Sequence, residues 1–328
     1  MAKLSDVGER EAIRLLTAIF DRGHPIGLGH DCGVVEWGED YLVITTDVVN
    51  PRTHIPGGSR PDQVGWYLVA VNLSDVAAAG ARALGFVAAL SLPPSTDTDF
   101  LRGLGQGMEA CAREFGIAIL GGDTKESDVP SFAGTAIGRV RKDRILLRKG
   151  ARPGDAIVVT GDLGRAGLAY AQLADPATRA EGLEELLRPY PRLREGAAFS
   201  DSGIVTSCMD ISDGLGLSLA QMAAMSGLSY SVEWEKVPLH KPLETMPADR
   251  QREYALYSGG DYELVATVKP EAAADLVARV NEPHRGSHHE LTVIGTVERA
   301  GPNTLAAGGK REPLQGRGWE HFRPSHSG

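Results

Sequence analysis

The chain has 328 residues, of which 42% are hydrophobic and 23% are charged, and this composition is typical of a soluble globular protein with room for two domains. Its formal net charge of −9 disfavours nonspecific binding to nucleic acids or membranes, because both present anionic surfaces. Phosphorylated ligands are not excluded, because bound metal ions can invert the local sign of the charge.

The cysteines and the N-terminal segment indicate the cell compartment. Cys32, Cys111 and Cys208 lie far apart in the sequence and form no CxxC pair, which argues against disulfides and against a thiolate zinc site. The N-terminal segment is charged and amphipathic, unlike a signal peptide, and no apolar run is long enough to span a bilayer. We therefore expect a protein of the reducing cytoplasm that binds neither membranes nor nucleic acids.

Hydrophobic periodicity predicts alternating helices and strands in the first half of the chain. Helices are expected over residues 8–21, 60–80 and 96–115, and strands over residues 41–46, 83–92, 117–120 and 132–140. Ser59 and Pro61 are expected to begin the second helix, as N-cap and first-turn residue. The strand over residues 117–120 is expected to end in the turn Gly121-Gly122.

The segment KGARPGD, at residues 149–155, combines glycine, proline and charge between two strand-like runs. We therefore predict a domain boundary there, with domains over residues 1–148 and 149–328. Beyond it, strands are expected over residues 156–160, 204–209, 228–234, 262–268 and 291–297, helices over 163–173, 215–225 and 271–280, and a loop over 301–318. This alternation predicts an α/β or α+β fold.

The usual phosphate-binding motifs are missing from the sequence. It has no GxxxxGK[ST] loop and no HRD motif, and its one run of spaced glycines lies inside a predicted helix. Acidic residues at turns are the alternative device. Five of them follow strands or glycine turns: Asp31, Asp47, Asp123, Asp210 and Asp213. The sixth, Asp75, lies late in a helix, one turn after Asn72.

Carboxylates gathered in this way would repel one another unless cations lay between them. Magnesium prefers oxygen ligands, and it would also neutralise a triphosphate that meets a phosphorylated acceptor. A single aspartate beside glycine is more often a turn residue, so only the whole set favours a site for several Mg²⁺ ions.

Three further features could contact phosphate, and each has an ordinary alternative. The Gly121-Gly122 backbone could approach phosphate oxygens or form a plain turn. Arg148 could clamp a phosphate or be a solvated surface residue, and His54 could bind substrate or simply be exposed.

Several motifs together resemble one family. They are LGHDCGVV, TTD, VNLSDVAAAGA, LGGDT, LRKGARPGD, TGDLGRAGLA, MDISDGLGLSLAQM, SGGDYEL, IGTV and GWEHF, in that order over residues 28–322. The chain thus resembles the thiamine-monophosphate kinases of the aminoimidazole ribonucleotide synthetase-like superfamily. The segments NLSDVAAAGA and DISDGL are specific to the superfamily, and the remaining motifs favour the kinase over its relatives.

The resemblance implies a fold, an activity and partners. The N-terminal domain would bind ATP and metal and pair with its twin into a β-barrel-like dimer core, and the C-terminal α/β domain would bind substrate. ATP would lie in the groove between the domains. The enzyme would transfer the γ-phosphoryl group of ATP to thiamine monophosphate, giving thiamine diphosphate, as a homodimer that needs several Mg²⁺ ions.

The resemblance also implies roles for single residues. The magnesium positions would be Asp31, Thr45, Thr46, Asp47, Asp75, Asp123, Asp210 and Asp213, and Asp123 and Asp213 are expected to be the most important for catalysis. The nucleotide contacts would be Gly122, Asp123, Arg148 and Ser212. His54 and Trp319 would contact the acceptor, since an aromatic face can stack on a cationic thiazolium, although Trp319 could instead be a core residue.

Two departures from the family pattern affect the acceptor. The chain has Gly29-His30-Asp31 where the family usually has Gly-Asp-Asp, so one carboxylate is lost. It has Ser258-Gly259-Gly260-Asp261 where the family has Ser-Gly-Gly-Glu-Asp, so either Asp261 binds the substrate or the acceptor differs.

Two other functions remain possible from the sequence. The chain could be another ATP-dependent synthetase or ligase of the superfamily, acting on a different small phosphorylated substrate. It could also be a nucleotide-binding subunit without activity, although the six aspartates argue against that because a binding module needs fewer charges.

Overall fold

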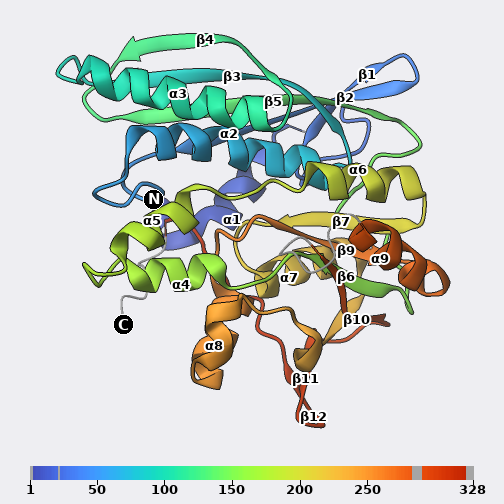
Figure 1. Ribbon diagram of the computed structural model, residues 1–328. Helices are drawn as coiled ribbons and strands as arrows, with labels where there is room; N and C mark the ends of the chain where they lie inside the picture. The colour runs from blue at the N-terminus through green and yellow to red at the C-terminus, as the bar shows by residue number, and fades with distance from the viewer. Residues whose placement is uncertain (1–2, 21–22, 283–289, 323–328) are drawn as a thin grey trace.

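The computed structural model describes residues 3–20, 23–282 and 290–322. Each half of the chain is built on a sheet, with the N-terminal sheet at the top of Figure 1 and the C-terminal sheet below it. This arrangement confirms the predicted mixed α/β fold. Among the helices in the described ranges, none combines the length and the apolar character needed to cross a bilayer.

The N-terminal sheet has five strands in the order β1-β2-β5-β3-β4. Their bounds are β1 (Gly33–Trp37), β2 (Asp40–Val49), β3 (Arg82–Leu92), β4 (Ala118–Glu126) and β5 (Ser131–Arg141). Neighbouring strands are antiparallel except for the parallel pair β3 and β4. The parallel pair is joined through α3 (Thr98–Glu114), as a crossover connection requires.

Helices α2 (Pro61–Ala78) and α3 cover one face of this sheet (Figure 1). Nearly every residue of α2 is buried, because the helix packs against the sheet, against α3 and against the C-terminal half. Glycines allow α2 and α3 to approach closely: a Cβ atom on Gly65 would lie 2.1 Å from the Leu104 carbonyl oxygen, and one on Gly107 would lie 1.9 Å from that of Asp62. The start of α2 differs from the prediction, because Arg60 is the N-cap, and the Ser59 hydroxyl bonds to the Pro56 carbonyl instead.

The other face of the N-terminal sheet is open. Its exposed large apolar residues are Val35, Trp37, Ile44, Val48, Leu84 and Leu120, and we call this surface the open face. The sheet does not close into a barrel in the described part of the chain, and β1 and β4 are its edges. The barrel that the resemblance implies is therefore not formed by one chain alone.

The C-terminal sheet has seven strands in the order β12-β11-β8-β10-β6-β9-β7. Their bounds are β6 (Ala156–Thr160), β7 (Val205–Ile211), β8 (Ser229–Glu233), β9 (Glu263–Val268), β10 (Leu291–Glu298), β11 (Thr304–Ala307) and β12 (Lys310–Pro313). All neighbours are antiparallel except β8 and β11. Strands β6 and β9 are buried along their whole length, so this sheet is a central layer.

Helices cover both faces of the C-terminal sheet. Ile157 and Val159 of β6 belong to the same apolar cluster as Leu215 of α7 (Leu215–Ser226), and Val158 belongs to that of Phe199 of α6 (Leu193–Ser202). The remaining helices are α4 (Arg165–Gln172), α5 (Arg179–Leu187), α8 (Ala248–Tyr257) and α9 (Ala273–Asn281). Helix α1 (Leu4–Thr17) lies where the two halves meet in Figure 1, and the Glu9 carboxylate accepts the His321 backbone N–H at 3.0 Å.

Two further local predictions were wrong, and four elements were missed. Strand β4 continues through Gly121-Gly122 to Glu126 instead of ending at a glycine turn. The predicted loop over residues 301–318 contains the hairpin of β11 and β12, which turns at Gly308 and Gly309 with φ of 53° and 76°. Elements β1, α5, α6 and α8 were not predicted, because each is short or has a weak apolar period.

Candidate active site

Three of the predicted aspartates converge where the two halves meet. One carboxylate oxygen from each of Asp31, Asp75 and Asp210 lies within 4.8 Å of the other two, and we call these residues the acidic cluster. Asp31 precedes β1, Asp75 lies near the end of α2, and Asp210 lies near the end of β7. The cluster therefore requires both halves of the chain to be folded and docked.

Neighbouring side chains orient these carboxylates. The Thr45 hydroxyl donates to Asp75 Oδ2 at 2.5 Å, and the Ser74 hydroxyl donates to Asp210 Oδ2 at 2.8 Å. The backbone N–H of Asp47 donates to Asn72 Oδ1 at 3.1 Å, which links β2 to α2 beside the cluster. The two bonds from Thr45 and Ser74 leave carboxylate lone pairs free for another partner.

The acidic cluster is electrostatically unstable without a cation. Burial, followed by the charges of Asp47, Asp210 and Asp31, raises the pKa of Asp75 well above its usual range. Burial, followed by the charge of Asp31, raises the pKa of Asp210 to about 7, and burial raises that of Asp47 to about 6. The negative charges of these carboxylates destabilise one another, and a bound divalent cation such as Mg²⁺, which prefers oxygen ligands, would relieve that repulsion.

Arg148 joins the acidic cluster to the C-terminal half. Its Nη2 atom lies 2.9 Å from Asp31 Oδ1, and its Nη1 donates to Gln221 of α7 at 2.8 Å. Its backbone N–H donates to Nδ1 of His30 at 3.3 Å, so His30 fixes the backbone from which the arginine side chain extends. Arg148 is thus not a free surface residue, and its nucleotide contact stays a prediction.

Aromatic side chains lie beside the acidic residues, and we call His54, Tyr67, Tyr262, Trp319 and His321 the aromatic cluster. The His54 ring centroid is 5.4 Å from that of His321 and 6.5 Å from that of Tyr67. The Trp319 ring is 5.9 Å from that of His321, and the Tyr67 ring is 5.9 Å from that of Tyr262. Trp319 is 42% exposed, so it is not the core residue of the alternative interpretation.

His54 is a neutral hydrogen-bond donor. Its Nδ1 accepts the Asn50 backbone N–H at 3.4 Å, so the proton of the neutral ring resides on Nε2. Burial, followed by the charge of His321, lowers the pKa of His54 to about 4, and the ring is uncharged at neutral pH. Nε2 has no partner among the described residues and is free to donate to a ligand.

The loop after β7 connects the acidic and aromatic clusters. The Asp213 carbonyl accepts the Trp319 backbone N–H at 3.0 Å, and the Ser212 carbonyl accepts that of Gly260 at 2.7 Å. Burial, followed by the charge of Glu9, raises the pKa of Asp213 to about 6. Asp213 therefore lies near the tryptophan but outside the acidic cluster.

Asp123 and Thr46 lie on the wrong face of the sheet to join the acidic cluster. Asp123 pairs with Ala89, Ala89 with Ala133, and Ala133 with Val48 of the open face. Directly paired residues share a face, so Asp123 points to the open face, and so does Thr46, two residues before Val48. The carboxylate of Asp123 is exposed and lies 3.3 Å from Lys125 Nζ. Within one chain, these two side chains cannot bind the same ion as Asp75.

Gly122 is also remote from the acidic cluster. It pairs with Ala88, which is two further strand pairings away from Asp47. Three strand spacings separate Gly122 from Asp47 by roughly 14 Å. The expected phosphate contact of Gly122 is therefore not made at the cluster of the same chain.

Asp261 has a structural role in this chain. Its two carboxylate oxygens accept the backbone N–H groups of Gly164 at 2.7 Å and Ala166 at 2.9 Å, at the start of α4. The residue is 2% exposed. This geometry gives no support to a contact between Asp261 and the acceptor, which stays a prediction.

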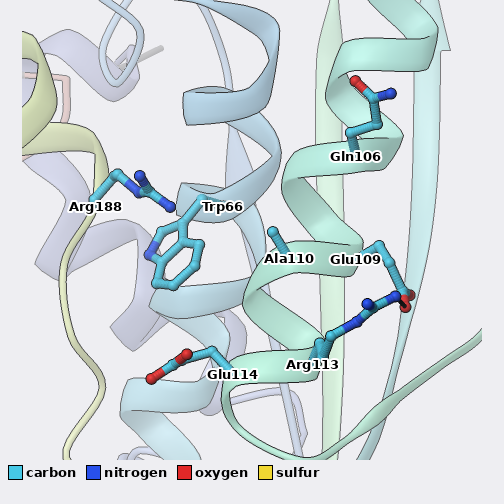
Figure 2. Close-up of a pocket in the computed structure, with 7 residues that line it drawn as sticks. All are labelled: Trp66, Gln106, Glu109, Ala110, Arg113, Glu114 and Arg188. Atoms are coloured by element: carbon cyan, nitrogen blue, oxygen red, sulfur yellow. Dashed lines mark hydrogen bonds and ion pairs between the residues drawn. The ribbon is translucent and has the colours of Figure 1, made fainter.

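A hollow on another part of the surface contains none of the predicted site residues. It has a volume of about 570 Å³ between α2, α3 and the segment after α5. Figure 2 shows Arg188 over the Trp66 ring, with the guanidinium carbon 4.4 Å from the ring centroid. Glu109 and Arg113, one turn apart on α3, form an ion pair at its wall. Its two carboxylates, Glu109 and Glu114, lie among Arg113 and Arg188, and neither belongs to the carboxylates that gather as a candidate metal site.

Comparison with known proteins identifies the family. A family model described as the N-terminal domain of AIR synthase related proteins matches residues 29–140, and one for the C-terminal domain matches residues 152–307. The thiamine-monophosphate kinase of Pyrococcus horikoshii is 33% identical over 98% of both chains. The chain belongs to the thiamine-monophosphate kinase family. The enzyme of the same name from Halobacterium salinarum is 36% identical over 95% of this chain and 99% of its own.

Solved structures of this family and its relatives have the same fold. The structure of AaThiL complexed with AMPPCP and TMP has a TM-score of 0.84 and 28% identity, over 98% of this chain and 99% of that one. A hydrogenase maturation protein solved in complex with ATP has a TM-score of 0.69 at 23% identity, over 96% and 97% of the two chains, so it supports the fold alone. The resemblance found in the sequence motifs is thereby confirmed.

Sequence reasoning missed three of the aromatic residues and one contact. Tyr262 lies within the motif SGGDYEL, whereas Tyr67 lies four residues before VNLSDVAAAGA and resembles an ordinary core residue, and His321 stands two residues after Trp319. A spacing of two between aromatic residues at a chain end was the available signal for His321. The contact between Glu9 and the His321 backbone had no signal in the sequence.

Proposed function

We propose that this chain transfers the γ-phosphoryl group of ATP to thiamine monophosphate, forming thiamine diphosphate and ADP. The observation that carries the proposal is the link between the aromatic cluster and the acidic cluster, through the Tyr262 N–H that bonds to Ile211 next to Asp210, in a chain that is 33% identical to a thiamine-monophosphate kinase over nearly its full length. A related structure holds AMPPCP, an ATP analogue, together with TMP. The reaction is a direct transfer between phosphates and needs no covalent enzyme intermediate.

The acidic cluster is the proposed magnesium site. Asp31, Asp75 and Asp210 would hold the first ion, and further ions would use Asp47, whose charge acts on Asp75, and Asp213, on which the charge of Asp47 acts in turn. Bound Mg²⁺ would neutralise the phosphates that must approach each other. Thr45 and Ser74 hold two of the carboxylates in place before any ligand arrives.

The chain's own residues would orient the two substrates. The exposed face of Trp319 can stack on the cationic ring of the acceptor, and the Nε2–H of His54 can donate to its phosphate. Arg148 lies beside Asp31 and would meet the nucleotide phosphates there. The side chain of Asp261 stays with α4 and is left out of this arrangement.

We further propose a homodimer formed through the open face. Six large apolar residues are exposed there, and an open sheet with unprotected edges is a template for association. Asp123 and Gly122 belong to the edge strand β4, so the dimer would offer them to the active site of the partner copy. Two five-stranded sheets packed in this way would supply the barrel-like core.

Two less specific assignments complete the proposal. The boundary near residues 149–155 falls between the two matched family segments, which supports domains over residues 1–148 and 149–328. All three cysteines are buried free thiols, which supports a cytoplasmic location.

An acceptor assay tests the proposed function. The purified protein is incubated with Mg-ATP and, in separate reactions, with thiamine monophosphate, thiamine or no acceptor, and the products are separated by chromatography. We expect thiamine diphosphate and ADP in equal amounts only with thiamine monophosphate. ADP without a phosphorylated acceptor would favour another superfamily reaction, and no turnover at all would favour a binding subunit.

A further inference from the structure

A buried tyrosine and a half-buried one share one hydrogen bond at the edge of the aromatic cluster. The hydroxyl oxygens of Tyr67 on α2 and Tyr262, just before β9, are 2.8 Å apart. Each hydroxyl carries one hydrogen, and a single bond between them uses only one of the two. Neither hydroxyl has another hydrogen bond among the described residues, so the pair keeps one O–H without an acceptor.

A buried donor without an acceptor is costly, and this one is held firmly in place. Tyr67 is 5% exposed and packs in the N-terminal core. Tyr262 has φ of 53°, which is rare for a residue with a side chain, and its N–H bonds to the Ile211 carbonyl at 3.0 Å. Strained backbone and unsatisfied buried polar groups both occur preferentially at ligand sites.

Within the aromatic cluster, the hydroxyl pair links His54 to the acidic residues, because the Tyr262 N–H bonds to Ile211, next to Asp210. On one side, the Tyr67 ring is 6.5 Å from the His54 ring. On the other side, Asp47 and Asp213 are close enough to influence the pKa of Tyr67, and Asp47 and Asp210 that of Tyr262. Burial and these charges raise the pKa of both tyrosines, so both hydroxyls stay protonated at neutral pH.

We infer that the unshared O–H of the Tyr67–Tyr262 pair binds the phosphate group of the acceptor. This inference rests on the proposed function. If the ring of the acceptor lies in the aromatic cluster and the γ-phosphate of ATP lies at the acidic cluster, the acceptor phosphate must lie between them. Neutral donors suit that position, because they bind phosphate oxygens without forming an ion pair with the nearby carboxylates.

The pair also distinguishes phosphorylated from unphosphorylated acceptors. Thiamine presents the same rings but no phosphate, so it leaves the O–H without an acceptor. A site with a buried group left unpaired rejects such an analogue strongly. The hydroxyl pair is therefore a specificity feature in addition to His54.

Binding measurements on phenylalanine variants test the inference. Tyr67→Phe, Tyr262→Phe and the double variant keep both rings and remove only hydroxyls. Isothermal titration calorimetry with thiamine monophosphate and with thiamine, at fixed Mg²⁺, separates the phosphate contribution from the ring contribution. Tyr41→Phe, on β2 beneath Lys142, is the matched control. Circular dichroism and the KM for ATP show whether the site is intact.

The expected pattern is asymmetric. Only one hydroxyl is the outward donor, so one single variant should lose about tenfold to a hundredfold in affinity for thiamine monophosphate, as for a hydrogen bond to a charged group. The double variant should lose as much as that single variant, and the other single variant should lose less. Affinity for thiamine should change less than about twofold in all variants.

The two possible failures are distinguishable. In the first case, the wild type phosphorylates thiamine monophosphate, but all three variants bind it as tightly as the wild type does. The same holds if the variants lose affinity for thiamine and for thiamine monophosphate equally. The inference is then wrong and the proposed function stands. If the wild type neither binds nor phosphorylates thiamine monophosphate, the proposed function fails and the inference fails with it.

Discussion

The aspartates of the acidic cluster and Asp123 of the edge strand β4 have similar sequence surroundings but differ in burial and in the face of the sheet on which they lie. Both regions carry an aspartate beside glycine or strand residues, in Met209-Asp210-Ile211 and in Gly122-Asp123-Thr124. Asp210 is 1% exposed and meets two other carboxylates, whereas Asp123 is exposed on the open face. The sequence identifies the type of ligand, but the face of the sheet decides which ligands can act together in one chain.

Removing a carboxylate from the acidic cluster should have the largest effect. Asp75→Asn keeps the shape of the side chain and its bond to Thr45, but it lowers the charge that holds the cation. We expect kcat/KM to fall by about a thousandfold or more, which is about 4 kcal/mol of barrier. Steady-state kinetics at saturating Mg²⁺ measures this change.

The matched control for that variant is Asp143→Asn, an exposed aspartate that is paired with Arg141 far from the cluster. Its activity should stay within about twofold of wild type. If Asp75→Asn retains more than a tenth of the activity while the control behaves as expected, the cluster is not the reaction centre.

A subunit-mixing experiment tests the role of Asp123 on strand β4. Asp123→Ala should also be inactive if the partner copy uses Asp123. Mixing it with Asp75→Asn should then restore about a quarter of wild-type activity, because half of the dimers are mixed and each has one intact site. Absence of recovery in dimers that have demonstrably exchanged subunits would mean that one chain supplies both Asp123 and Asp75 to its site, and an active Asp123→Ala variant would exclude Asp123 from catalysis.

The fold was largely predictable, whereas the site was predictable only in part. The apolar runs of β3, β5, β6, β9 and β10 and the apolar surface of α2 specified their elements directly. The convergence of Asp31, Asp75 and Asp210 followed from motif order combined with resemblance. The open-face position of Asp123 could not be predicted, because it depends on a register with Ala89 that no local pattern encodes. The tyrosine pair depends on a contact across 195 positions of the chain.

The acceptor side of the site should be less sensitive than the metal side. Trp319→Ala removes an aromatic face that is worth about 0.5 to 2 kcal/mol, so the KM for thiamine monophosphate should rise a few-fold to roughly thirtyfold. The KM for ATP should stay unchanged. A rise in both constants, with a lower melting temperature, would instead indicate that Trp319 supports the loop of Asp213 through its backbone bond.

The smallest effect concerns stability and pH. The pKa values of Asp47, Asp210 and Asp213 are raised to about 6, 7 and 6, so the folded protein without metal binds more protons than the unfolded chain between about pH 4 and 7. The contribution of these three carboxylates to the free energy of unfolding is therefore greatest below pH 4, and it falls as the pH rises through 7. We expect the melting temperature in EDTA to fall by a few degrees between pH 5 and pH 8.

Magnesium should cancel that loss, because it replaces the protons as counterions. The rise in melting temperature on adding Mg²⁺ should be larger at pH 8 than at pH 5. An equal rise at both values would mean that these carboxylates do not bind the metal. Asp75→Asn should reduce the difference between the two values.

A single-turnover reaction tests the central claim most directly. Enzyme in excess over ATP labelled with ³²P at the γ-position is mixed with thiamine monophosphate and Mg²⁺, and the label is followed on a time scale shorter than product release. The account predicts that the label appears in the terminal phosphate of thiamine diphosphate, at the same rate as ADP forms. Label that appears first in inorganic phosphate, or in a protein-bound form, would contradict direct transfer at the acidic cluster.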